Sequence, residues 1–123
     1  YYNSDQLEEA KAAITKALEI NPDDSQTNNL LGMYWLQKQD VAKAKAQFED
    51  ALRREPSNAG AYYYLALIAR SQGDNQTALT NLAKAIETAP TFKAAYELSA
   101  QIYEATGNPS AAQQFRAVMN QIK

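Results

Sequence analysis

The sequence predicts an all-α protein made of stacked helical hairpins, and two observations carry that prediction. A period of 34 residues runs along the chain, because the segments that end at Pro22, Pro56 and Pro90 align without gaps as AKAAITKALEINP, AKAQFEDALRREP and ALTNLAKAIETAP. Within each segment, small and large apolar residues recur at the three- and four-residue spacing of amphipathic helices. A hairpin of this size cannot bury both of its faces alone, so it must stack on its neighbours.

A turn signal recurs with the same period and divides each unit into two helices. Gly73 and Gly107 supply the left-handed residue that ends a first helix, and Asp74 and Asn108 then cap the second. Gln39–Asp40 stands at the equivalent place in the preceding unit. The proline that closes each unit stops the second helix, because the residue before a proline is driven out of the α region.

These signals predict seven helices, an isolated second helix followed by three complete hairpins. In chain order they span residues 5–20, 24–38, 41–54, 58–72, 75–88, 92–106 and 109–122. In three of the second helices, alanines flank one large apolar residue, so that two helices approach closely while the large side chain fills the gap. These large residues are Ile14, Phe48 and Leu82. The last helix departs from the pattern, with Arg116 where a large apolar residue is expected and Met119 where alanine is expected.

The pattern resembles the tetratricopeptide repeat, whose unit is a 34-residue helix–turn–helix. The unit at 25–58 matches the family motif at Leu31, Gly32, Ala44, Phe48, Ala51 and Pro56. Asn28 departs from the usual aromatic residue, and Trp35 stands where tyrosine is usual. The resemblance covers essentially the whole chain and implies a right-handed α-solenoid of about three and a half repeats. It divides the chain into a partial repeat at 1–24, repeats at 25–58 and 59–92, and a terminal repeat with a capping helix at 93–123.

The two ends of the chain differ from a complete unit. The sequence begins at Tyr1 and so contains little of the first helix that would pair with helix 5–20, and we expect the face that this partner would cover, including some of Leu7, Ile14 and Leu18, to be partly bare. This expectation favours either a preceding repeat in a longer protein or self-association through the N-terminal edge. At the other end, polar residues on the outer surface of helix 109–122 are typical of a capping helix.

Composition argues against several classes of function. The chain contains no cysteine and no histidine, which removes thiol chemistry, the commonest general base and a leading metal ligand. A net charge of −2 with scattered lysine and arginine gives no field for nucleic acid, and no run reaches the roughly 18 apolar residues of a membrane span. No phosphate-binding loop is present. The sequence therefore predicts a protein without catalysis, cofactor, metal or nucleic-acid partner, and it leaves cytoplasm and periplasm equally open.

In the family that the chain resembles, first helices line a concave groove that takes an extended peptide or a helix. The stripe of each first helix that core packing does not use gives the candidate groove residues. They are Gln26, Asn29, Met33, Leu36, Gln37, Tyr63, Tyr64, Leu67, Arg70, Glu97, Gln101 and Glu104. Such a groove is amide-rich at one end, apolar and aromatic in its middle and acidic at the other end. The alternative for Met33, Leu36 and Leu67 is packing between neighbouring first helices.

Three adjacent tyrosines receive three different predictions, since consecutive helical residues point about 100° apart. Tyr62 is expected in the core, Tyr63 on the groove, and Tyr64 at the border between neighbouring first helices.

The resemblance predicts a non-catalytic protein–protein interaction module that binds a peptide or helix of a partner. The clamp with which some members of the family hold a C-terminal carboxylate is not favoured, because only Asn29 fits its pattern. One alternative is a structural spacer or self-assembly segment of a larger multi-repeat protein. Another is the accessory arm of an enzyme or of a secretion or envelope machine.

Overall fold

The computed structural model of the 123-residue chain describes residues 25–122 together with Glu9, Ala12, Ala13 and Lys16. Those four residues are helical. The rest of the helix predicted at 5–20 lies outside the described residues. So do the bare face and the self-associating edge that were predicted on it.

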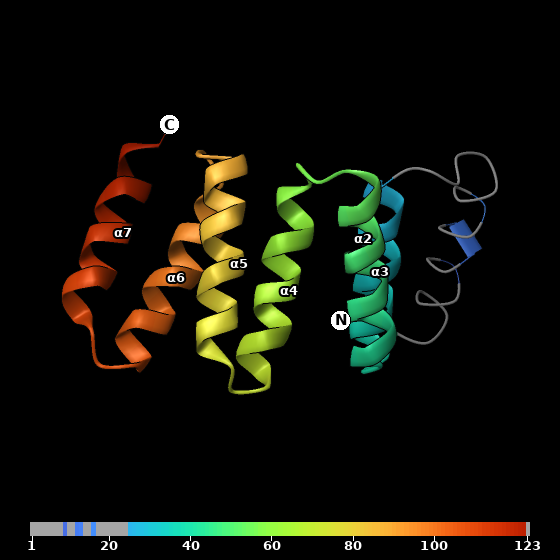
Figure 1. Cartoon of the computed structure of the whole chain (residues 1–123), viewed down its shortest axis with the longest axis horizontal. Helices are drawn as coiled ribbons and strands as arrows, with labels where there is room; N and C mark the ends of the chain where they lie inside the picture. Colours follow the sequence, from blue (N-terminus) through green and yellow to red (C-terminus); the bar gives the residue numbers. More distant parts are fainter. Residues whose placement is uncertain (1–8, 10–11, 14–15, 17–24, 123) are drawn as a thin grey trace. The chain divides into compact units, whose positions relative to one another are not determined.

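Six helices lie within residues 25–122, and none of the described residues forms a strand (Figure 1). They are α2 (Ser25–Gln37), α3 (Val41–Arg54), α4 (Ala59–Ser71), α5 (Asn75–Thr88), α6 (Lys93–Ala105) and α7 (Pro109–Gln121). Each ends within one residue of its predicted bounds, which confirms six of the predicted helices. The predicted total of seven is not reached within the described residues.

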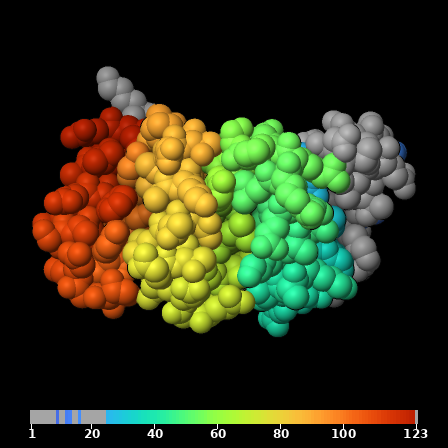
Figure 2. Space-filling model, viewed as in Figure 1, coloured from blue at the N-terminus to red at the C-terminus, as the bar shows by residue number. Residues whose placement is uncertain are grey.

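The chain divides into two compact units, Tyr1–Ala61 and Tyr62–Lys123, with the boundary inside α4. In unit 1, α2 packs on α3. In unit 2, α6 packs on both α5 and α7. The side chains of α6 and α7 fill the space between the two ribbons of that hairpin (Figure 2).

The turn inside each hairpin has the same backbone geometry, as the recurrent sequence signal predicts. The first turn residue has a positive φ in all three cases: 63° at Gln39, 80° at Gly73 and 84° at Gly107. The next backbone N–H donates to the carbonyl five residues earlier, which is the closing bond of a Schellman motif. These bonds run from Asp40 to Trp35, Asp74 to Ala69 and Asn108 to Tyr103, at 2.9, 2.9 and 2.7 Å.

The second turn residue also begins the following helix. Its side-chain oxygen accepts from the backbone N–H three residues later, which satisfies one donor that the helix leaves unpaired. These caps join Asp40 to Lys43, Asp74 to Thr77 and Asn108 to Ala111, at 3.2, 3.1 and 3.2 Å. One residue therefore ends one helix and starts the next, and this fixes the relative direction of the two helices.

The alternation of small and large residues builds the core as predicted. Phe48 is completely buried with Ala44 and Ala51 on either side of it in α3, and α5 repeats the arrangement with Leu82. A Cβ atom at Gly32 would lie 2.6 Å from the Phe48 ring, so the absence of a side chain in α2 makes room for that ring. Close approach at a small residue therefore sets the spacing of α2 and α3.

In the α6–α7 hairpin the aromatic residue of the second helix is Phe115, one position before the residue that aligns with Phe48. Phe115 stacks on Tyr103 with ring centroids 5.5 Å apart, and its ring lies 6.3 Å from that of Tyr96. Tyr96 is buried, and its hydroxyl group donates a hydrogen bond of 2.8 Å to the Pro90 carbonyl oxygen. Among the helices of the described residues, none is both long and apolar enough to cross a bilayer.

Candidate functional site

The candidate groove residues of unit 1 lie on α2. Gln26, Met33 and Gln37 are exposed, and Leu36 is half-buried. Leu30, which sequence reasoning did not select, is 50% exposed and lies on the same helical stripe as the exposed three. We call Gln26, Leu30, Met33 and Gln37 the α2 stripe. The four-, three- and four-residue intervals between its members are the signal that could have identified Leu30.

Asn29 lies beneath this surface, only 7% exposed, and the structure does not bring it together with the α2 stripe. Its Nδ2 donates to Asn58 Oδ1 at 2.9 Å. The same oxygen accepts from the backbone N–H of Ala61 at 3.1 Å and so caps the start of α4. Gly60 leaves the space that the Asn29 side chain uses, since a Cβ there would lie 3.1 Å from Nδ2. In this structure Asn29 therefore serves packing and helix capping rather than an exposed surface.

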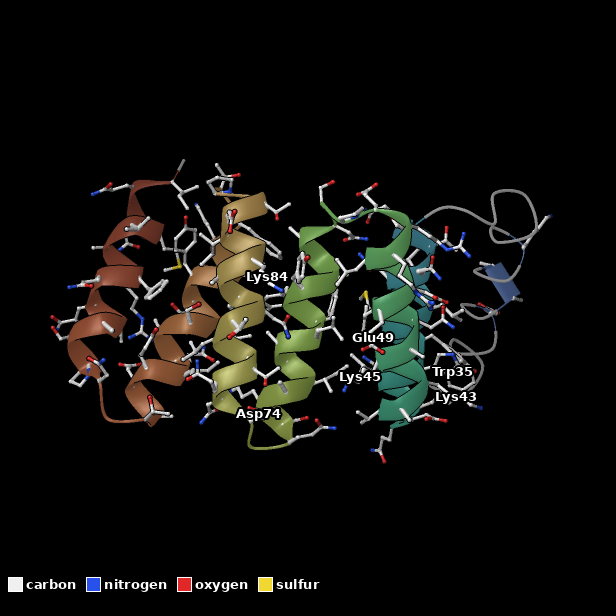
Figure 3. All side chains as sticks on the ribbon, viewed as in Figure 1. Trp35, Lys43, Lys45, Glu49, Asp74 and Lys84 are labelled. Atoms are coloured by element: carbon white, nitrogen blue, oxygen red, sulfur yellow. The ribbon has the colours of Figure 1, made fainter. Side chains whose placement is uncertain are left out.

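Two residues of α2 that depart from the family pattern also have partners inside unit 1. Asn28 is buried, and its Nδ2 donates to Gln47 Oε1 at 3.0 Å. The Lys43 ammonium lies 4.4 Å from the centroid of the Trp35 ring, a cation–π distance (Figure 3). Both contacts join α2 to α3, so they serve the hairpin rather than a ligand.

The candidate residues of unit 2 begin with the tyrosines of α4. The Tyr63 ring lies 5.2 Å from that of Phe92 and 5.6 Å from that of Tyr64, to which it is nearly perpendicular. Both tyrosines are half-buried, and so is Leu67. Burial raises the pKa of the Tyr64 hydroxyl, and the neighbouring Tyr63 raises it further. Tyr63 is thus held between two other rings, and Phe92 is a contact that sequence reasoning missed.

Tyr62 corrects a sequence prediction, because it is half-buried rather than fully in the core. The Lys84 ammonium of α5 lies 5.7 Å from its ring centroid, a cation–π distance. The buried aromatic residue at this repeat position is Tyr96 in α6.

The remaining candidates of unit 2 are joined by a continuous chain of polar contacts. Arg70 Nη1 donates to Gln101 Oε1 at 3.0 Å, and this bond links α4 to α6. Gln101 Nε2 in turn donates to Glu97 Oε1 over a longer distance of 3.5 Å. Leu67 lies one helical turn before Arg70, so an apolar side chain adjoins this polar chain.

Arg116 of α7 completes this series of polar contacts. It was not among the residues that the sequence predicted for the groove. Its Nε and Nη2 donate to the two carboxylate oxygens of Glu97 at 3.3 and 3.1 Å, a bidentate pair. Nη2 also donates to Glu104 Oε1 at 2.8 Å. We call Arg70, Gln101, Glu97, Arg116 and Glu104 the Arg116 network.

These bonds change the electrostatics that the sequence predicted. The hydrogen bond from Arg116 lowers the pKa of the Glu97 carboxyl and that of the Glu104 carboxyl. The same two bonds raise the pKa of Arg116. The predicted acidic end of the groove is therefore corrected: both carboxylates are paired with one guanidinium. The signal in the sequence is the arginine at a position where the register expects a large apolar residue.

The described residues contain no cluster of three or more acidic side chains suited to holding a metal ion. The features that they present on first helices are exposed apolar side chains, half-buried tyrosines and a paired ionic network. Exposed apolar side chains beside half-buried aromatic ones offer surface for contact with another molecule.

Models of the tetratricopeptide repeat match three stretches of the chain, residues 1–24, 36–91 and 69–119. Over 86 residues, 70% of its own length, the chain is 30% identical to the Cell division cycle protein 27 homolog of Caenorhabditis elegans. That alignment covers 11% of the relative, so the chain spans about a tenth of the curated protein that it matches.

Two solved structures share the fold at low sequence identity. The crystal structure of MamA superposes with a TM-score of 0.77 at 22% identity, over 89% of this chain and 64% of that one. A chain in the crystal structure of the APC/C hetero-tetramer Cut9–Hcn1 superposes with a TM-score of 0.84 at 15% identity, over 95% of this chain and 22% of that one.

Proposed function

This chain belongs to the tetratricopeptide repeat family, and from that premise we propose that it is a non-catalytic module that binds a segment of a partner protein on its first helices. The similar structure of Cut9–Hcn1 is described as a hetero-tetramer, an assembly held by contacts between protein chains. This description supports a protein as the partner.

The observation that carries the proposal is the α2 stripe. Leu30 is 50% exposed and Met33 38% exposed, and they are two of the three large apolar side chains exposed in the described part of the chain. Adjacent exposed apolar side chains mark interaction surfaces, and the flexible methionine adapts to the shape of a partner. Gln37, at one end of the stripe, is exposed, and its amide group can bond to the backbone of a bound segment.

The α2 stripe also allows a cleaner test than Tyr63. A Tyr63→Ala change removes the contacts with Phe92 and Tyr64, so it alters stability as well as surface. Leu30→Gln and Met33→Gln change side chains that are already exposed, and such surface substitutions shift stability by about 0.5 kcal/mol or less. Val118→Gln on α7 is the matched control, because Val118 is 45% exposed and lies on a second helix.

The experiment compares the three variants with the unaltered protein. Partners are captured from the source lysate, the bound segment is identified, and its affinity is measured by calorimetry as a synthetic peptide. We expect Leu30→Gln and Met33→Gln each to weaken binding by about tenfold, while Val118→Gln leaves it unchanged and all melting temperatures stay close. Equal affinity for all variants would contradict the proposal and favour the structural spacer.

A further inference from the structure

We infer that Arg116 sets the charge of the first-helix face of unit 2, so that the partner segment bound there carries a carboxylate rather than a cationic side chain. The inference rests on the proposed function and specifies the chemistry of the partner. Arg116 stands where the repeat pattern has a large apolar residue, and it holds Glu97 and Glu104.

The two glutamates of α6 are already occupied by an internal cation. Glu97 and Glu104 lie two helical turns apart on one stripe of α6, and without a partner they would attract a lysine or arginine of a ligand. Arg116 already makes three hydrogen bonds to them and forms ion pairs of 3.1 and 2.8 Å. A cationic ligand must therefore displace a bidentate internal guanidinium, so the carboxylates are poor sites for it.

Two cations of this face, Arg70 and Lys93, have no carboxylate partner among the described residues. Arg70 is half-buried and bonded to the neutral amide of Gln101, and no carboxylate of the described residues forms an ion pair with it. Lys93 is exposed one helical turn before Glu97, and it too has no ion pair within the described part of the chain. Because Glu97 and Glu104 share one guanidinium and keep one net negative charge, Arg70 and Lys93 leave these five residues with one net positive charge that a ligand can compensate.

Tyr63 and Leu67 lie on the same stripe of α4 as Arg70. Tyr63, Leu67 and Arg70 follow one another at four- and three-residue intervals, so that one stripe of α4 carries an aromatic, an aliphatic and a cationic side chain. Guanidinium groups bind carboxylates through strong charge-assisted hydrogen bonds. The ligand that fits this order is an extended protein segment with an acidic side chain next to apolar ones.

The experiment uses two synthetic peptides of identical apolar composition, one containing two glutamates and the other two lysines in their place. Each peptide is titrated into isotopically labelled protein, and NMR follows the Nε–Hε signal of Arg70 and the amide of Leu67. We expect the glutamate peptide to bind about tenfold more tightly than the lysine peptide. The preference should decline with added salt, because these charges are accessible to screening.

Three variants separate the causes. Arg70→Gln should weaken the preference severalfold, because only Lys93 then remains to attract a carboxylate, and Arg116→Gln should reverse it by releasing Glu97 and Glu104. Lys45→Gln is the control, because it removes one positive charge from an exposed position on α3 and should leave the preference intact. If Arg116→Gln does not fold, as circular dichroism would reveal, the double change Glu97→Gln with Glu104→Gln replaces it and should strengthen binding of the glutamate peptide.

A lysine peptide that binds equally well or better, or an Arg70 signal that no peptide shifts at millimolar concentration, overturns the inference. The proposed function has a separate readout. If Leu30→Gln and Met33→Gln abolish partner binding while the glutamate peptide leaves Arg70 unaffected, the interaction module stands and the assignment of its partner's charge falls.

Discussion

The α2–α3 and α6–α7 hairpins place opposite chemistry at one position of the repeat. In α3 this position holds Phe48, which is completely buried beside Gly32. In α7 it holds Arg116, which is 33% exposed and bound to Glu97 and Glu104.

The difference shows how one backbone pattern accepts two kinds of contact. The α6–α7 hairpin keeps an aromatic contact because Phe115, the neighbour of Arg116, stacks on Tyr103. Ala100 stands where α2 has Gly32, and it is fully buried. A bulky ring thus requires glycine opposite it, whereas the arginine hairpin tolerates a methyl group. The first hairpin gains stability from this position, and the second gains a controlled charge on its surface.

Truncation of the buried ring is expected to have the largest effect on stability. Phe48→Ala leaves a cavity between α2 and α3 and should lower the free energy of unfolding by about 3–5 kcal/mol. Urea denaturation measures this loss, with Leu30→Ala as an exposed control in the same hairpin. A loss below about 1 kcal/mol would mean that the hairpin does not depend on this ring.

Substitution of Gly32, which faces the Phe48 ring, should have the second-largest effect on stability. Gly32→Ala places a methyl group 2.6 Å from the buried Phe48 ring, and such overpacking should cost about 1–3 kcal/mol despite the better helix propensity of alanine. In α6 the reverse change, Ala100→Gly, should cost about 1 kcal/mol, because helix propensity falls and the methyl contacts are lost. Thermal melting of the two variants compares the sites. If Gly32→Ala raised the melting temperature, the ring would be shown to move aside.

Substitutions at the positive-φ residue of the turn should change stability in opposite directions in the two hairpins. Gln39 adopts a φ of 63° that glycine accepts more readily, so Gln39→Gly should stabilise by about 0.5–1 kcal/mol. Gly107 has a φ of 84°, so Gly107→Gln should destabilise by about 1 kcal/mol. Denaturant midpoints of both variants provide the measurement. Shifts in the same direction for both would disprove the equivalence of the two turns.

The ion pairs of Arg116 with Glu97 and Glu104 should have the smallest effect on stability, and this effect should depend on pH. Arg116 lowers the pKa of Glu97 and Glu104 below their ordinary 4.5, so their contribution to stability is present above that pH. As the pH falls below 4.5 the unfolded chain binds protons first, and the contribution disappears at the lowered folded-state pKa. Melting curves of the unaltered protein and Arg116→Gln should therefore converge on acidification. If the difference in melting temperature between the two proteins stayed constant with pH, the ion pairs would be excluded as its cause.

Features set by nearby residues could be predicted from the sequence. Helix ends followed from proline, glycine and capping residues, and Asp40, Asp74 and Asn108 cap their helices as expected. The small–large–small pattern around Phe48 and Leu82 also identified buried residues. These predictions were confirmed because the physical causes lie within one turn of helix or within one fixed period.

Contacts between distant side chains could not be predicted in this way. The pairing of Asn29 with Asn58 depends on the space at Gly60, and the bonds of Arg116 depend on where a long side chain lies relative to α6. Periodicity assigned Asn29 to a surface stripe and left Leu30 out, although Leu30 is the exposed residue. Stripe membership gives the direction of a side chain, whereas its exposure depends on what packs beside it.

The shared residue at each hairpin turn has a consequence for how the length of the chain can vary. Asp40 both completes the closing bond of α2 and caps α3, so the turn contains no spare residue. One inserted residue would rotate the following helix by about 100° and move its buried face to solvent. At the links between hairpins, by contrast, Pro56–Ser57 and Pro90–Thr91 are exposed. Insertions, tags and proteolytic cuts should be tolerated at these links and rejected at the turns.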